Sequence, residues 1–347
     1  MGKTKVALIL AVLAAVFYAA SAPFSKVLME NIPPTMMAAF LYLGAGCGVG
    51  IMYAVHWKKE APSERLSKRD LPYTIAMIVL DILAPIFLMV GIAQGNASNA
   101  SLLGNFEIVA TTVIALVVFR EPVSGKLWIA IIFIVVASIM LSWESQASLD
   151  LSFGSIFVIL ATICWGIENN CTRKISDKST YEIVVLKGVF SGGGALMIAL
   201  AIGERFFDPV LIAIAMALGF VSYGLSIFFY IRAQAVLGAA KTSAYYAIAP
   251  FVGVILAALF LGEHFTILFG VAFLVMAIGA AFTVMDTFDR EHAHEHRHTV
   301  VHRHDGKIHA HAFVHSHSHR HAIGIRPHLH RHPQSTFDEE LERLHAS

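Results

Sequence analysis

Ten long runs of apolar residues restrict the fold of this chain more than any other feature of its sequence. A bilayer core about 30 Å thick is crossed by a helix of about 20 apolar residues. Runs of this kind lie near 5–25, 34–56, 72–93, 97–118, 126–143, 153–172, 182–202, 208–231, 241–261 and 265–286. Only 14% of the residues are charged, whereas soluble domains carry about a quarter. The sequence therefore predicts an all-α polytopic membrane protein with ten transmembrane helices.

The ten predicted spans form two sets of five that resemble each other in the same order. Residues 13–18 align with 160–165, Gly46 with Gly192, and 118–121 with 260–263. Such repeats are typical of secondary transporters. Residues 20–22 (Ala-Ser-Ala) look like a signal-peptide cleavage site, but the repeat indicates that the first span is retained. We expect two five-helix repeats followed by a polar tail, at 1–143, 144–286 and 287–347.

The distribution of basic residues predicts the orientation. With the N-terminus inside, the inner loops hold twelve lysines and arginines, whereas the outer connections hold only Lys26 and Arg205. This asymmetry places both termini in the cytoplasm, with the protein in the plasma or inner membrane of the cell. Because five is an odd number, the halves insert in opposite orientations, which gives two related states open to opposite sides. A receptor or scaffold that transports nothing is the alternative, and inverted repeats favour transport over it.

Four short motifs resemble the EamA-like branch of the drug/metabolite transporter superfamily over about 1–286. They are FREP at 119–122, LGEH at 261–264, NFE at 105–107 and AP at 249–250; the last two resemble the halves of the family's Glu-Pro element. The resemblance implies export or uptake of small organic solutes, often amino acids or metabolites, through a central cavity between the halves. It also implies a basic residue near the start of the second span of each repeat, where this chain has Lys187 in the second half and Leu41 in the first.

Ionisable residues within the predicted spans are the candidates for a substrate and proton cavity. A charge at mid-bilayer costs about 2.5–3.5 kcal/mol on insertion scales, so each should face the bundle interior. A carboxylate there can bind a proton on one side of the membrane and release it on the other. Three acids against one lysine favour a cationic or zwitterionic solute. The predicted cavity residues are Asp81, Asn105, Glu107, Glu168, Lys187, Tyr245 and Tyr246.

Structural roles for the same residues stay open. Lys187 and one acid can form a purely structural pair, and Glu168 can lie in the headgroup region, where its charge costs little. Asp81 and Glu107 are the stronger functional candidates. Glu121 and Glu263 fall at helix junctions and are expected to be caps.

Glycines and prolines within the spans predict how the helices pack and where they break. Gly44, Gly46, Gly48 and Gly50, with 192–194, predict close helix packing. Pro85 and Pro250 are predicted to interrupt helices.

The C-terminal tail is rich in histidine, with sixteen of the eighteen histidines at 292–345. It has too few apolar residues to form a core, so we expect it to be disordered. Imidazole binds zinc, nickel, copper and cobalt, and the spacing predicts that the tail binds such metals; no cofactor is required for transport. The tail would buffer, sense or deliver metal, or serve only as a polar extension. The predicted metal ligands are His292, His294, His296, His298, His302, His304, His309, His311, His315, His317, His319 and His321.

The leading hypothesis is an EamA-like transporter of small organic solutes, coupled to protons. The alternatives are a transition-metal transporter, a transporter regulated by metal through its tail, and a membrane-anchored metal sensor that transports nothing. No nucleophile–base set or phosphate-binding loop indicates an enzyme, and no basic stripe with aromatics indicates nucleic-acid binding. The expected partners are the bilayer, a small solute and divalent metal at the tail; a homodimer stays open.

Overall fold

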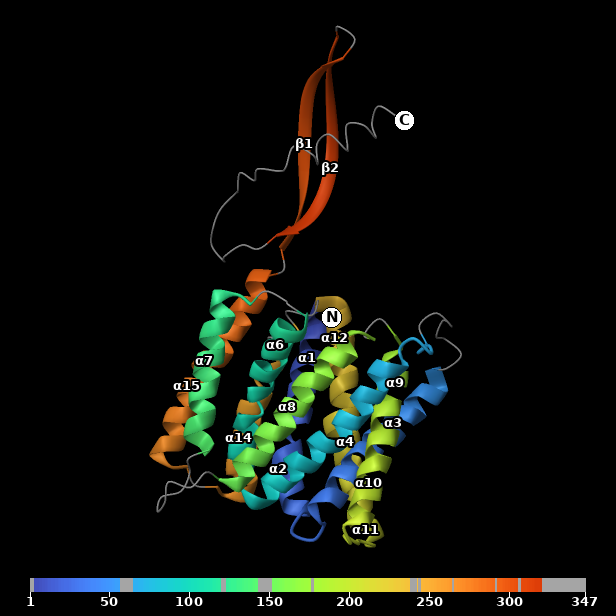
Figure 1. Ribbon diagram of the computed structural model, residues 1–347, viewed down its shortest axis with the longest axis vertical. Helices are drawn as coiled ribbons and strands as arrows, with labels where there is room; N and C mark the ends of the chain where they lie inside the picture. Colours follow the sequence, from blue (N-terminus) through green and yellow to red (C-terminus); the bar gives the residue numbers. More distant parts are fainter. Residues whose placement is uncertain are drawn as a thin grey trace. The chain divides into compact units, whose positions relative to one another are not determined.

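The computed structural model describes most of the chain as helix (Figure 1). The described residues are 3–56, 65–119, 123–142, 152–175, 178–237, 242, 245–263, 265–290, 292–304 and 307–319. The helices are α1 (Lys3–Ala19), α2 (Ser21–Leu28), α3 (Pro34–His56), α4 (Leu71–Gln94), α5 (Ala97–Leu103), α6 (Phe106–Phe119), α7 (Gly125–Ser142), α8 (Phe153–Arg173), α9 (Thr180–Leu186), η3 (Lys187–Ser191), α10 (Gly192–Ala201), α11 (Pro209–Gly219), η4 (Phe220–Leu225), α12 (Ser226–Leu237), α14 (Ala249–Leu261) and α15 (Ile267–Arg290). Two strands follow, β1 (His292–His304) and β2 (Lys307–His319). The chain divides near Val284 into a helical unit and a C-terminal unit.

Within the described residues, nine helical stretches are long and apolar enough to cross a membrane. They correspond to nine of the ten predicted spans, and together they make this a polytopic membrane protein. The remaining predicted span, 241–261, is described as the shorter apolar helix α14. This helix begins at Ala249 because Pro250 lies in its first turn, where a missing N–H donor costs nothing.

Several spans depart from a continuous α-helix. A proline explains the break between α1 and α2, but the proline within α4 causes no break. α1 ends at Ala19 and α2 starts at Ser21, since the ring of Pro23 would clash with the carbonyl of residue 19 in a continuous helix. Pro85, in contrast, lies inside α4, which continues from Leu71 to Gln94. The prediction that Pro85 breaks a helix was therefore wrong. Two other spans contain π-helical segments, η3 and η4.

The two halves interleave in a reciprocal way. α8 of the second half packs against α4 and α6 of the first, and α1 of the first half packs against α12 and α14 of the second. The second spans meet across the halves, α3 against α10. The fifth spans, α7 and α15, lie side by side (Figure 1), with the rings of Phe133 and Phe282 6.2 Å apart. Each half thus uses equivalent spans to contact the other, as expected for two related repeats.

Glycine makes the contact between the second spans possible. A Cβ atom added to Gly188 would lie 2.3 Å from the Cα of Gly46, and one added to Gly46 would lie 2.6 Å from the backbone nitrogen of Val189. Only hydrogen on both residues allows the backbones to come this close. The predicted packing role holds for Gly46 but not for Gly193, where an added Cβ atom would lie more than 4 Å from every described residue outside its own stretch of helix.

The C-terminal unit contains an antiparallel pair of strands. β1 pairs with β2 over thirteen residues each, from His292 opposite His319 to His304 opposite Lys307. At 292–304 and 307–319 the structure describes a pair of strands where disorder was expected from the sequence. Its physical reason is readable in the sequence: the strands alternate residue types with period two, carry β-branched residues at their centre, and flank Asp305-Gly306, a dipeptide that favours two-residue hairpin turns.

Candidate functional site

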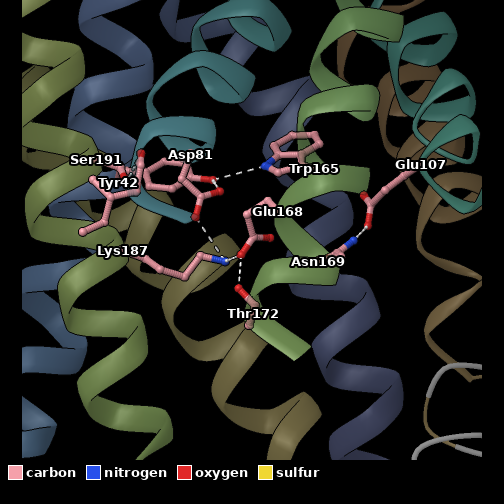
Figure 2. A network of polar contacts seen from close by, with 10 residues as sticks. Tyr42, Asp81, Glu107, Trp165, Glu168, Asn169, Thr172, Lys187 and Ser191 are labelled. Carbon is pink, nitrogen blue, oxygen red and sulfur yellow. Dashed lines mark hydrogen bonds and ion pairs between the residues drawn. The ribbon is translucent and has the colours of Figure 1, made fainter. Parts of the chain in front are cut away.

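A buried cluster of charges lies where the two halves meet (Figure 2). It consists of Asp81 from α4, Glu168 from α8 and Lys187 at the start of η3. The Nζ atom of Lys187 is 3.2 Å from Oδ2 of Asp81 and 2.9 Å from Oε1 of Glu168. Asp81 and Glu168 are buried, with 0% and 2% of their surface exposed. We call these three residues the buried charge cluster.

The local backbone explains how Lys187 reaches the acids. Lys187 is the first residue of the π-helical segment η3. Short π segments within α-helices are frequent at functional sites. The next residue, Gly188, allows η3 to press against α3. The hydroxyl of Ser191 donates to the carbonyl oxygen of Ile78 at 3.2 Å, which ties η3 to α4 one turn from Asp81.

Neutral donors complete the surroundings of both carboxylates. The hydroxyl of Tyr42 donates to Oδ1 of Asp81 at 3.2 Å, and the indole N–H of Trp165 donates to the hydroxyl oxygen of Tyr42 at 3.4 Å. Thr172 donates to Oε1 of Glu168. With all three ionisable groups charged, the buried charge cluster carries two negative charges and one positive charge.

A third acid, Glu107, lies on the other side of α8. The side-chain amide of Asn169 donates to Oε1 of Glu107 at 2.6 Å, and Glu107 stands in the first turn of α6. A negative charge is favourable at a helix N-terminus. Because Asn169 directly follows Glu168, α8 presents one polar residue to the buried charge cluster and the next to Glu107 (Figure 2).

Four tyrosines extend from the buried charge cluster to α1 and the segment before α14. The ring centroids of Tyr42 and Tyr223 are 5.3 Å apart, those of Tyr223 and Tyr18 5.9 Å, and those of Tyr18 and Tyr246 5.8 Å. Ser21 donates to the hydroxyl oxygen of Tyr223 at 3.0 Å. We call Tyr42, Tyr223, Tyr18 and Tyr246 the tyrosine row.

The structure places the predicted site residues unequally. Asp81, Glu168 and Lys187 form one cluster. Glu168 is buried with two partners, which argues against the alternative that it lies in the headgroup region. Tyr246 belongs to the tyrosine row. Asn105 is buried just before α6, and Tyr245 is half-buried.

Two predictions concerned helix junctions. The carboxylate of Glu263 accepts hydrogen bonds from the backbone N–H groups of Ala97 and Ser98 at 2.8 and 3.0 Å. Glu263 therefore caps the N-terminus of α5, which agrees with the predicted capping role. Glu121, with the rest of 120–122, lies outside the described residues.

Sequence reasoning missed Tyr18, Tyr42, Trp165 and Tyr223. One signal was available, since the alignment of 13–18 with 160–165 matches Tyr18 with Trp165. No sequence pattern pointed to Tyr42 and Tyr223, because tyrosine is common in membrane spans and its hydroxyl partners depend on tertiary packing.

Possible metal-binding groups can be assessed only among the residues that the structure describes. In that part of the chain, no group of three or more His, Cys, Asp or Glu side chains is arranged to hold a metal ion. For 292–304 and 307–319 the structure gives the backbone, and His321 lies outside the described residues.

These observations define a polytopic helical membrane protein of two interleaved halves with a buried charge cluster between them. The model of the EamA-like transporter family matches it twice, at residues 5–143 and 152–285. The chain belongs to the EamA-like transporter family and is a multi-pass membrane transporter.

Two further comparisons concern the sequence and the fold. An uncharacterized transporter of Methanothermobacter thermautotrophicus is 25% identical over 285 residues, which cover 77% of this chain and 82% of the relative. A solved structure, described only as the crystal structure of a protein, superposes with a TM-score of 0.59 over 80% of this chain and 94% of its own, at 13% identity. The second likeness concerns the fold alone.

Proposed function

We propose that this transporter moves a small cationic or zwitterionic organic solute, such as an amino acid or a related metabolite, by alternating access in exchange for protons. The observation that carries the proposal is the unequal number of charges in the buried charge cluster, where one ammonium faces two carboxylates.

The excess negative charge needs a partner. Removing an ion from water costs several kcal/mol unless it is paired, and both acids are buried. A proton or the ammonium group of a solute can each supply the missing positive charge. Because the two compete for the same carboxylates, release of one favours binding of the other, which couples the solute to the proton gradient.

The position of the buried charge cluster suits alternating access. Asp81 belongs to the first half, whereas Glu168 and Lys187 belong to the second. Inverted repeats alternate between outward-open and inward-open states by moving relative to each other around a central site. A charge change at residues shared by both halves would therefore bias that movement.

The tyrosine row supports a cationic solute. Ammonium groups are attracted to the faces of aromatic rings within about 6 Å of the centroid. Tyr42 both donates to Asp81 and lies in this row, so a solute amine that binds Asp81 would also meet aromatic surface. A carboxylate on the same solute would find its partner in Lys187.

A transport assay in proteoliposomes tests the proposal. Vesicles that contain the full chain and the pH dye pyranine are exposed to a panel of cationic, zwitterionic, neutral and acidic solutes, and to zinc, nickel and cobalt salts. We expect a cationic or zwitterionic solute to raise the lumenal pH, because solute entry drives protons out. Transport of an organic anion or of metal alone would contradict the proposal.

Matched carboxylate-to-amide variants locate the site. Asp81→Asn/Glu107→Gln should lower solute-driven proton movement at least about tenfold, since hydrogen bonds to charged groups contribute about 1.5–3 kcal/mol. The control is Asp208→Asn, which makes the same chemical change at the exposed N-cap of α11, where asparagine caps about as well. Retained transport in the double variant would place the site elsewhere.

A further inference from the structure

The C-terminal unit pairs histidines directly across its two strands. In the register of β1 and β2, four histidines of one strand each lie opposite a histidine of the other. The pairs are His292 with His319, His294 with His317, His296 with His315, and His302 with His309. Residues directly opposite in an antiparallel pair share a face, with Cβ atoms about 4.5–5.5 Å apart.

The register also sorts every histidine of both strands onto one face. Successive residues of a strand alternate between its two faces. All six histidines of β1 have even numbers, all five of β2 have odd numbers, and the register pairs even positions of β1 with odd positions of β2. A slip of one residue would place the two sets on opposite faces, so the one-sided arrangement depends on this register.

The rest of this face carries little competing charge. Its other positions in the two strands are Val300, Phe313 and Lys307. The acidic residue and both arginines of β1 fall on the opposite face, at positions 295, 297 and 303. Histidine therefore occupies nearly all positions of this face.

We propose that this face of the hairpin is a transition-metal site in which the cross-strand histidine pairs are the chelating units. Imidazole is the preferred nitrogen ligand of zinc, nickel and copper(II), and bound metals of this group leave further positions for water. The paired histidines of opposite strands occupy facing positions only in this register. This proposed metal site does not depend on which solute the helical unit transports.

Two double variants of equal composition test the role of pairing. His302→Gln/His309→Gln removes one complete pair, whereas His302→Gln/His317→Gln removes one histidine from each of two pairs. Each variant loses one histidine from β1 and one from β2. The full chain in detergent is dialysed against zinc, and the metal bound per chain is measured.

If pairs are the binding units, the second variant should lose roughly twice as much zinc as the first, because a single imidazole rarely holds zinc without further protein ligands. Equal losses would show that only the number of histidines counts, and no zinc on the parent chain would overturn the proposal altogether. The unfolding temperature of the helical unit should be unchanged in both variants, which separates metal loss from misfolding. Ser316→Gln/Ser318→Gln, on the opposite face of β2, is the control that should keep full binding.

Discussion

At the scale of single residues, the buried charge cluster has more negative than positive charge. Lys187 is the partner of both Asp81 and Glu168, so its loss and the loss of one acid have opposite effects on the charge balance. The same asymmetry underlies the proposed exchange of a proton for a cationic group.

Lys187→Met should therefore destabilise the protein far more than Asp81→Asn. Removing one partner of a buried ion pair costs about 3–5 kcal/mol, and Lys187→Met leaves two unpaired acids, whereas Asp81→Asn leaves Glu168 and Lys187 as an equal pair. Thermal unfolding of the purified variants in detergent measures the difference. The deficit of Lys187→Met should shrink at lower pH, because protons neutralise the acids; equal loss of stability in both variants at neutral pH would contradict the charge count.

The charged residues of the site were largely predictable from the sequence, because ionisable groups within apolar spans must be buried together or face water. Asp81, Glu168 and Lys187 were identified on that ground. A headgroup position stayed open for Glu168 because this residue lies near the end of its predicted span. Of the uncharged residues beside the cluster, Trp165 had only its alignment with Tyr18 as a signal, and Tyr42 had none. Their hydrogen bonds depend on tertiary packing.

At the scale of elements, the contact of η3 with α3 positions Lys187. Gly188 and Gly46 meet there with backbones almost touching. The next segment, α10, contains Gly193, where an added Cβ atom would lie more than 4 Å from every described residue outside its own stretch of helix. Gly188 and Gly193 are five residues apart in the chain but differ completely in the space around them.

Gly188→Ala should lower both stability and transport, whereas Gly193→Ala should not. The added methyl group at Gly188 would meet backbone atoms of α3, and overpacking of this kind costs about 1–3 kcal/mol. Gly193→Ala adds the same methyl group to an open position and gains helix propensity, about 1 kcal/mol. Unfolding temperature and transport rate, measured side by side, report the contrast; an equal effect of both changes would show that the close approach of η3 and α3 is not required.

Some boundaries between helical segments can be predicted from the sequence, and others cannot. The proline in the first turn of α14 is visible in the sequence, and so is its effect on the start of that helix. The π segments η3 and η4 are not, because a π turn depends on packing and not on a residue type. The strand pair of the C-terminal unit lay between these cases: Asp305-Gly306 and the period-two alternation were present, but the small number of apolar residues favoured the prediction of disorder.

At the scale of the whole molecule, the account requires two related halves with an even number of spans in total. The reciprocal packing of α8 on α4 and of α1 on α12 fits that plan. An even number of spans places both termini on one side, and the basic residues of the loops predict that this is the cytoplasmic side.

Accessibility of terminal tags tests this topology. Epitope tags at the two ends of the full chain should be protected from an added protease in intact cells and become cleavable only after the membrane is permeabilised. Exposure of one tag in intact cells would place the termini on opposite sides. The inverted arrangement of the halves, and the alternating access that rests on it, would then be wrong.

The most direct measurement of the central claim is solute binding beside Asp81, reported by Trp165. Its indole donates to Tyr42, which donates to Asp81, so a solute amine that binds this acid changes the environment of the indole. Substitution of the other three tryptophans, Trp57, Trp128 and Trp143, by phenylalanine leaves Trp165 as the single fluorophore. We predict a saturable change in its fluorescence with the transported solute, an apparent affinity that weakens as the pH falls, and loss of the change in Asp81→Asn. An unchanged affinity in Asp81→Asn would contradict the claim that the buried charge cluster binds the solute.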